Sequence, residues 1–357
     1  MVLHQQATPG AEPIGPPIII TGWLGWVRQT FFNTPVNTVI TFTCLLFLWR
    51  VLPPFYDWAF QTALWEGDAK ACRQPGVGAC WAFVIEKLRF VLFGFYPADL
   101  HWRPLAMMGL FITMIAASSY QRFWRRELFY AWLLALAAMY ILMAGGVFGL
   151  ARIETRQWGG LPLTMSLAII GLVAAFPIGI LLALGRRSRM PVIRIMCVVY
   201  IECIRGVPLI TILFMSAIMF PLLLPEGVQI DKLLRAQVAL ILFAAAYIAE
   251  IVRGGLQSRG LGYWRMMRKV ILPQALKIVI PPMVNTFIGF FKDTTLVIII
   301  GLFDFLTAIR SALTDPAWLG FHVEAYVFAA SVYFLFCFSM SRYSLWLERH
   351  LSPERRR

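Results

Sequence analysis

Long apolar segments constrain this chain more than any other feature of its sequence. Runs close to the ~20 residues that a helix needs to cross a bilayer occur eight times along the 357 residues. Hydrophobic residues make up 60% of the chain and charged residues 14%, well below the ~25% charged residues of soluble domains. We therefore expect an all-α polytopic membrane protein with about eight transmembrane helices. The approximate spans are 36–52, 105–120, 128–150, 161–185, 207–224, 235–252, 273–300 and 322–345.

The net charge of +14 comes from arginines gathered in short segments between these spans. This distribution is typical of the cytoplasmic side of a membrane protein and argues against nucleic-acid binding. The long loop 53–104 mixes both signs of charge, and we expect it on the opposite side. Both termini are then cytoplasmic. The basic segments contain Arg122, Arg125 and Arg126, then Arg186, Arg187, Arg189 and Arg194, then Arg253, Arg259, Arg265, Arg268 and Lys269, and finally Arg349, Arg355, Arg356 and Arg357.

The chain divides near residue 158 by composition. Residues 1–157 hold an N-terminal segment with Trp23 and Trp26, expected at the membrane interface, three spans and the outer loop. Residues 158–350 hold five spans with glycine and proline inside the apolar runs, a composition that transporters tolerate around cavities. Residues 351–357 form a basic tail. We expect the function in the second part.

Two cysteines of the outer loop, Cys72 and Cys80, flank a Gln-Pro-Gly-Val-Gly turn. In an oxidising compartment they can form a disulfide, although two free thiols remain an equal alternative. No histidine accompanies them, so a metal site is not expected there. The remaining cysteines lie in or beside apolar spans, where a thiol usually acts as a small hydrophobe.

The apolar run 273–303 is too long for one straight helix. Lys292 follows Pro273 by nineteen residues, which corresponds to about 28 Å of helix and reaches the far interface. Leu296 to Phe303 is nevertheless apolar, so the chain must tilt, break or re-enter near Lys292 and Asp293. Ionisable residues at such a depth are commonly functional, and a structural ion pair or helix cap is the equally weighted alternative.

Two further charge pairs lie one helical turn apart. Glu202 can meet Arg205, and Glu250 can meet Arg253, because residues three apart share a helix face. We interpret both as structural pairs.

Catalytic and nucleotide-binding motifs are missing. The sequence contains no H-E-x-x-H, no G-x-S-x-G and no G-x-x-x-x-G-K-[ST], so it predicts neither an enzyme nor a subunit that holds ATP in a phosphate-binding loop. No cofactor and no metal are expected. ATP-driven transport would require a separate subunit.

Four segments resemble a known family: CIRGVPLI at 203–210, AEIVRGGLQ at 249–257, GLGYWRMMRKVILPQALKIVIPP at 260–282 and NTFIGFFKDTTLV at 285–297. They are similar to the permease subunits of polar amino-acid ABC importers, and in particular to the M-type permeases of general L-amino-acid transporters of proteobacteria. The resemblance implies a five-helix core in the bacterial inner membrane and alternating access. It implies as partners an ABC ATPase, a second homologous permease, a periplasmic amino-acid-binding protein, an L-amino-acid substrate and membrane lipid.

The resemblance also implies a cytoplasmic loop that docks on the ATPase. The family pattern has Glu-Ala-Ala, three residues, Gly, nine residues, Ile, one residue and Leu-Pro. This chain matches its second half but has Gly254-Gly255-Leu256 where Glu-Ala-Ala should stand, as if the intervening residues were deleted. We therefore expect impaired coupling to ATP hydrolysis. The loop residues are Gly254, Gly255, Gly260, Leu261, Gly262, Tyr263, Trp264, Val270, Leu272 and Pro273.

Our candidates for the substrate path or gate are Asn285, Lys292, Asp293 and Thr294. Two alternatives remain open. A secondary amino-acid transporter would also use broken helices and buried ions but would work without an ATPase. A non-transporting scaffold would keep the spans and need no polar residues within them.

Overall fold

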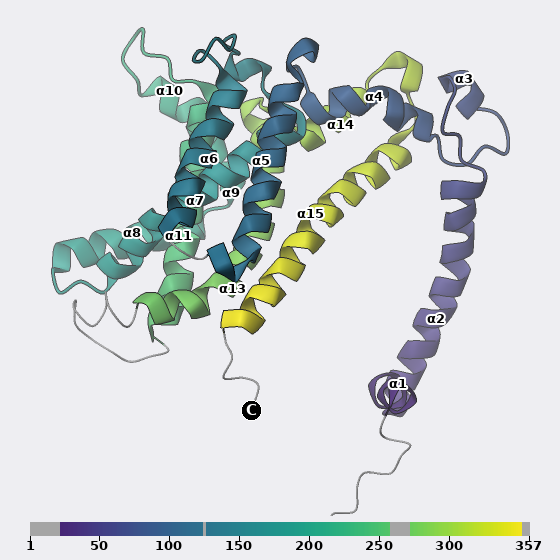
Figure 1. Ribbon diagram of the computed structural model, residues 1–357, viewed down its shortest axis with the longest axis horizontal. Coiled ribbons are helices and arrows are strands. Elements are labelled where there is room, and N and C mark those ends of the chain that lie inside the picture. The colour runs from purple at the N-terminus through teal and green to yellow at the C-terminus, as the bar shows by residue number, and fades with distance from the viewer. Residues whose placement is uncertain (1–21, 124–125, 258–271, 352–357) are drawn as a thin grey trace, which may run out of the picture. The chain divides into compact units, whose positions relative to one another are not determined.

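The computed structural model describes residues 22–123, 126–257 and 272–351. These residues are almost entirely helical (Figure 1), which confirms the predicted fold class. The α-helices are α1 (Trp23–Phe31), α2 (Pro35–Tyr56), α3 (Ala69–Cys72), α4 (Trp81–Phe93), α5 (Trp102–Ser119), α6 (Arg126–Ala144), α7 (Gly160–Arg186), α8 (Pro191–Gly206), α9 (Leu209–Phe214), α10 (Phe220–Leu222), α11 (Lys232–Gln257), α13 (Leu272–Asp293), α14 (Phe305–Ala312) and α15 (His322–Leu351).

Short helical segments of other types connect them. The π-helices are η2 (Asp57–Gln61) and η6 (Met215–Met219), and the 3₁₀ segments are η3 (Ala98–Leu100), η4 (Gln121–Phe123), η5 (Thr155–Gln157), η8 (Thr294–Ile300) and η9 (Pro316–Trp318). A two-residue strand, β1 (Phe303–Asp304), follows η8.

Five helical segments of the described residues are long and apolar enough to cross a membrane: Pro35–Gln61, Ala98–Ser118, Gly160–Arg186, Lys232–Gly255 and His322–Arg349. A sixth is counted if α8 and the segment Leu209–Leu222, bent by 103°, form one span. The expected number was about eight. The bend of this pair lies where Val207 precedes Pro208 and takes an extended conformation, as residues before proline prefer.

The chain forms two compact units, residues 1–81 and 82–357. In the described part of the first, α1 exposes Trp23 and Trp26, as an interfacial helix would. A disulfide joins Cys72 to Cys80 in the loop that follows η2. The division near residue 158 that the composition suggested separates a predicted functional part from the rest of the chain. It stays a prediction.

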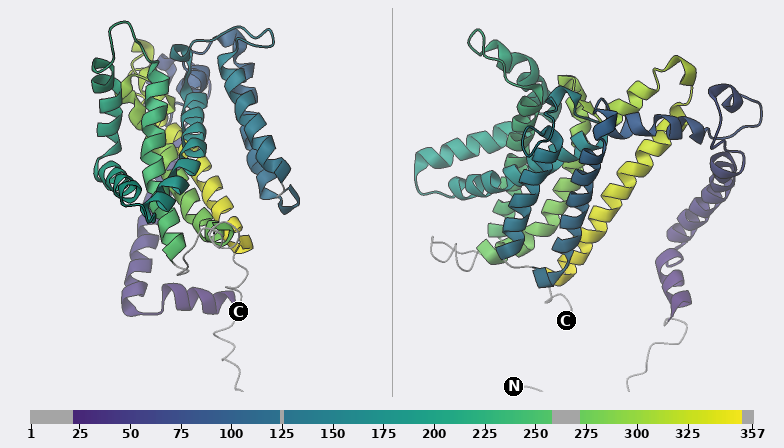
Figure 2. Two further views of the ribbon diagram at one scale, coloured as in Figure 1. Left: turned by 90° about the vertical axis from the view of Figure 1, so that its left-hand side faces the viewer. Right: turned by 45° about the horizontal axis from the view of Figure 1, so that its top comes forward.

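Helix α7 forms the centre of the second unit. It packs along α11 and also contacts α8, α13 and α5, and α5 lies side by side with α6 (Figure 2). A Cβ on Gly179 would lie 2.6 Å from the Ile248 side chain, and one on Gly171 would lie 2.8 Å from the Phe290 ring. Small residues at these positions allow the close helix approach that is common in membranes.

Three segments cross at the end of this unit that carries α4, α10 and α14, which we call the upper end (top of Figure 1). Gly159 and Gly160 form parallel bridges with Phe303 and Asp304. Gly94, just after α4, lies so close that a Cβ on it would be 2.8 Å from Gly159 Cα. This crossing joins the end of α4, the start of α7 and β1. The opposite end, with the start of α13 and the end of α15, is the lower end.

A buried arginine fixes α5 to the end of α6. The Arg103 side chain is 0% exposed. Its Nε donates to the Leu142 carbonyl at 2.7 Å, and its Nη1 donates to the Ala151 carbonyl at 2.9 Å. The last carbonyls of a helix have no partner within the helix and carry partial negative charge. Arg103 therefore satisfies the end of α6 with its positive charge.

An ion pair at the upper end connects α4 to the segment before α15. Lys87 Nζ lies 2.6 Å from Asp315 Oδ2. The neighbouring Glu86 accepts the indole N–H of Trp318 at 2.9 Å. The hydrogen bond raises the pKa of Lys87 above its usual value and lowers the pKa of Asp315 below its usual value.

These shifts predict a pH window for the pair. Because the pKa of Lys87 is raised on folding, its contribution to stability is fully present below the unfolded pKa and is lost as the pH rises through the folded pKa. Because the pKa of Asp315 is lowered on folding, its contribution to stability is fully present above the unfolded pKa and is lost as the pH falls through the folded pKa. The Asp315→Asn variant should thus melt at a slightly lower temperature than the parent by a constant difference between about pH 5 and 9. The difference should disappear in strong acid. A difference that grows steadily across the neutral range would contradict this prediction.

Candidate functional site

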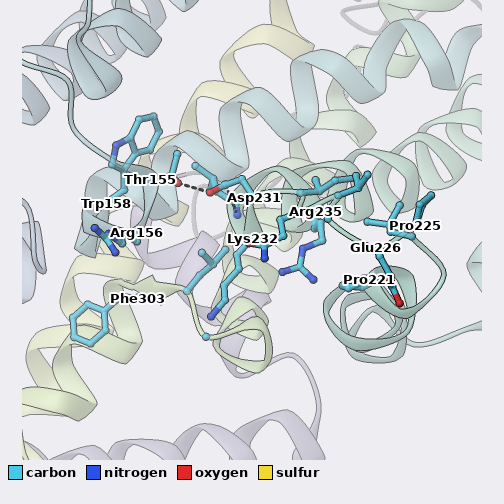
Figure 3. Close-up of a pocket in the computed structure, with 18 of the residues that line it drawn as sticks. Thr155, Arg156, Trp158, Pro221, Pro225, Glu226, Asp231, Lys232, Arg235 and Phe303 are labelled. Atoms are coloured by element: carbon cyan, nitrogen blue, oxygen red, sulfur yellow. Dashed lines mark hydrogen bonds between the residues drawn. The ribbon is translucent and has the colours of Figure 1, made fainter.

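A cavity of about 940 Å³ opens at the upper end of the second unit (Figure 3). Its walls come from η5 and Trp158, from the loop before α11, and from the residues that follow η8. The cavity therefore gathers the starts of two central helices and the end of the broken helix. Charged residues of both signs line it: Arg156, Glu226, Asp231, Lys232 and Arg235.

Asp231 organises one wall of this cavity. Its Oδ1 accepts the backbone N–H groups of Leu233 at 2.8 Å and Leu234 at 3.2 Å, as a helix cap does. Its Oδ2 accepts the Thr155 hydroxyl at 2.5 Å, shown by the dashed line in Figure 3. Because both oxygens are engaged, Asp231 fixes the start of α11 against η5.

Two basic residues on the first turn of α11 differ in their surroundings. Arg235 Nη1 donates to the Ala217 carbonyl at 2.6 Å, and Ala217 belongs to the π-helix η6, whose widened turn leaves carbonyls available. Lys232 is exposed and has no ion-pair partner among the described residues. Its Nζ lies 3.9 Å from the position of a Cβ on Gly301. Lys232 is thus the cation of this wall that remains free to meet an anion.

The broken helix ends at the residues predicted for it. Helix α13 stops at Asp293, continues as the 3₁₀ segment η8, and turns at Gly301, whose φ is 76°. Thr294 is buried, and its hydroxyl donates to the Phe291 carbonyl at 2.8 Å. A break of this kind exposes backbone groups that must be satisfied by protein or a polar cavity.

A cluster of charges joins three helices near the lower end. Glu250 on α11 lies 3.4 Å from Arg186 Nη1 at the end of α7 and 3.6 Å from Arg205 Nη1 on α8. It also accepts Arg253 Nε at 2.7 Å, the predicted pair. The other predicted pair is wrong: Glu202 lies 2.8 Å from Arg186 rather than pairing with Arg205, because helix packing brings Arg186 to that face.

Comparison with known proteins identifies the family. Residues 175–353, about half of the chain, match the family model described as binding-protein-dependent transport system inner membrane component. The chain is 49% identical over 348 residues to the inner membrane amino-acid ABC transporter permease protein YhdY of Escherichia coli, covering 92% of this chain and 93% of that protein. The chain belongs to this family.

The chain is also similar to two other proteins. The permease is 34% identical over 419 residues to BztC, a glutamate/glutamine/aspartate/asparagine transport system permease protein of Rhodobacter capsulatus, covering 95% of this chain and 96% of that protein. The crystal structure of an amino acid ABC transporter with histidines has a TM-score of 0.48 and 28% identity, covering 54% of this chain and 92% of that chain.

The function predicted from the motifs is confirmed. The chain is a permease subunit of an amino-acid ABC importer and a multi-pass protein of the inner membrane. The alternative of a secondary transporter is not supported. Permeases of this family work with ATPase and binding-protein subunits.

The structure separates the four residues predicted for the substrate path. Asn285 lines a cavity of about 270 Å³ between α13 and α15, together with Ser341 and Glu348. Lys292 is exposed, Asp293 is half-buried and Thr294 is buried. The described residues show no ion pair between Lys292 and Asp293. Of the two structural interpretations, an ion pair or a helix cap, only the second remains, because α13 ends at Asp293. Asn285 precedes Lys292 by seven residues, about 10 Å along a helix.

Most of the predicted ATPase-docking residues lie outside the described residues: Gly260, Leu261, Gly262, Tyr263, Trp264 and Val270. Gly254 and Gly255 belong to the last turns of α11, and Leu272 and Pro273 begin α13. Sequence reasoning missed the charged wall of the upper cavity. Its signal was Asp231 immediately before an apolar helical run, a pattern that predicts a helix start.

Proposed function

We propose that the upper cavity receives an L-amino acid from a periplasmic binding protein and that the substrate then passes η8 toward the lower end. A free amino acid carries one cation and one carboxylate, so a cavity with both signs of charge suits it. The observation that carries the proposal is the exposed Lys232 in a cavity that the acidic Glu226 also lines. The relatives named for amino-acid transport support this substrate class.

The orientation follows from the charges. The lower end carries Arg186 and Arg253, at the ends of α7 and α11, and lies next to the basic segments that favour the cytoplasm. The upper end then faces the periplasm, where a soluble receptor can reach the cavity. Both termini remain cytoplasmic in our proposal, on the charge pattern of the sequence alone. Asn285, Lys292, Asp293 and Thr294 remain our candidates along the path, at different depths.

The permease holds no nucleotide site of its own in this proposal. A separate ABC ATPase docks on residues 254–273, and a second homologous permease completes the path. The segment lacks the Glu-Ala-Ala half of the family pattern, which would form the start of the docking helix. We therefore expect weaker stimulation of ATP hydrolysis by the loaded binding protein than a permease with the full pattern gives.

One reconstitution tests these statements. The importer, assembled in liposomes with its ATPase, second permease and binding protein, should take up labelled amino acid only with ATP. Lys232→Gln should lower uptake about tenfold, because the loss of one charge-assisted hydrogen bond costs about 1.5 kcal/mol. The matched control is Arg310→Gln, an exposed arginine on α14 outside the cavity.

Three results would count against the proposal. An equal loss of uptake in Lys232→Gln and Arg310→Gln would contradict the assignment of the cavity as the substrate site. Uptake without ATP would contradict the importer mechanism. Strong stimulation of ATP hydrolysis by the binding protein would remove the expectation of weak coupling while leaving the rest intact.

A further inference from the structure

The cluster around Glu250 has a feature that simple helix packing does not require. Three guanidinium groups surround one carboxylate, from the ends of α7, α8 and α11. With Glu202, the cluster holds three positive and two negative charges, so it keeps one excess positive charge. Removing Glu250 would leave three cations close together with only Glu202 to balance them.

Glu250 and Glu202 occupy unequal positions in this cluster. Glu250 contacts all three arginines, and its side chain is 20% exposed. Glu202 contacts Arg186, and its side chain is 54% exposed. Solvent screens the exposed pair more strongly than the partly buried ones. The connection between the three helices therefore depends mainly on Glu250.

Besides the pair of Glu202 with Arg186 at 2.8 Å, the described residues show further contacts of helix α8 with the centre. The Tyr200 hydroxyl donates to the Leu242 carbonyl on α11 at 2.7 Å. Cys197 packs on Gly185 of α7, where a Cβ would lie 2.5 Å from its Sγ. At its end, α8 turns by 103° into the next segment. The polar contact of α8 with Glu250 is made by Arg205, whose guanidinium also lies 5.6 Å from the Tyr247 ring centre.

The place of Glu250 along α11 gives this contact a mechanical consequence. It lies four residues before Gly254, where the predicted ATPase-docking segment begins within the last turns of α11. A displacement of the end of α11 acts on a helix that is tied by charge to α7 and α8. Because Glu250 is shared among the arginines, the three helices are expected to move together or to separate together.

We propose that Glu250 is a positioning residue that ties α8 to α7 and α11, so that movement at the docking segment is passed to α8 during transport. The transport part of this proposal rests on the proposed function. The tie itself is a property of the permease and is measured separately below.

The test uses native Cys197 as a reporter. In the assembled importer, with Cys44, Cys203 and Cys337 replaced by serine, a membrane-permeant maleimide should label Cys197 slowly, because it packs on Gly185. Glu250→Gln should accelerate labelling by about tenfold, since the rate follows the population in which α8 has separated. Glu202→Gln, the same charge change at the exposed position, should leave the rate within about twofold.

Arg205→Gln provides a second variant in case Glu250→Gln does not assemble. It removes the contact of α8 with Glu250, while Glu250 keeps Arg186 and Arg253 and Glu202 keeps Arg186, and it should also accelerate labelling. Unchanged labelling in Glu250→Gln, or in Arg205→Gln when Glu250→Gln fails to assemble, overturns the tie. Equal acceleration by Glu202→Gln shows a general charge effect and overturns the role of Glu250.

Uptake per ATP hydrolysed distinguishes positioning from mere stability. Glu250→Gln should lower this ratio several-fold with ATP hydrolysis retained, whereas a destabilised permease loses both activities in proportion. A proportional loss overturns the positioning role. If the parent importer shows no ATP-dependent uptake, the proposed function fails, and the labelling rates still decide whether Glu250 holds α8.

Discussion

Replacing Gly160 by alanine is expected to disrupt the upper end of the permease. Gly160 has a φ of 63°, and a Cβ there would lie 2.1 Å from the Leu92 carbonyl oxygen and 2.9 Å from Phe93 N. The left-handed conformation costs a non-glycine residue about 1–2 kcal/mol. The overlap adds at least about 1–3 kcal/mol, because it involves backbone that cannot rotate away. The crossing of α4, α7 and β1 should then open.

The measurement is the fraction of detergent-extracted permease that elutes as a single folded species, together with its melting temperature. Gly160→Ala should lose most of this fraction. Gly109→Ala is the matched control, because Gly109 lies inside α5 with nothing within 4 Å of an added Cβ. A normal yield and melting temperature for Gly160→Ala would show that the crossing does not hold the upper end together.

Replacing Arg103 by methionine is the second change with a large expected effect. Methionine keeps the length and apolar character of the side chain but removes every donor. The carbonyls of Leu142 and Ala151 would lose the Arg103 donors, and the Leu142 carbonyl would keep the longer 3.4 Å hydrogen bond from the Tyr96 hydroxyl. A hydrogen bond from a charged donor contributes about 1.5–3 kcal/mol, so losing both should lower the stability of the α5–α6 pair by about 3 kcal/mol.

Thermal melting of the purified permease checks this result, and limited proteolysis of the loop after α6 gives a local readout. Arg103→Met should lower the melting temperature and increase cleavage near Ala151. The control is Arg89→Met, because Arg89 is exposed on α4. Equal behaviour of the two variants would mean that Arg103 contributes no more than a surface arginine.

The sequence predicted the helical fold class and most of the apolar helices, because their signals are local, although it predicted about eight spans where the described residues contain five or six. A run of apolar residues must be helical in a membrane, where its backbone groups have no water to bind. Proline and the Lys292-Asp293 pair predicted the break of α13, and the structure ends that helix at Asp293. The bend between α8 and α9 was not predicted as such, although Pro208 carries its signal. The family motifs predicted the function for the same reason, since they are contiguous.

The candidate site was predictable only in part. Lys292, Asp293, Thr294 and Asn285 were chosen because they are polar residues in an apolar run, and the structure gives them different depths and degrees of burial. The upper cavity draws its charged lining from segments before α7 and before α11. No local sequence pattern predicts that segments so far apart in the chain lie next to each other.

By itself, the sequence determined that this chain is a helical membrane permease, where its helices run and where one of them breaks, because those properties depend on neighbouring residues and on the bilayer as solvent. The sequence also predicted the Glu250–Arg253 pair within α11, but only the tertiary structure decided which charges of different helices meet. Glu202 lies one turn from Arg205 but pairs with Arg186, and Glu250 meets the same Arg186 across 64 residues of chain. Packing of α7 against α8 and α11 sets those distances, and the strength of a charge pair depends on distance and burial rather than on sequence spacing.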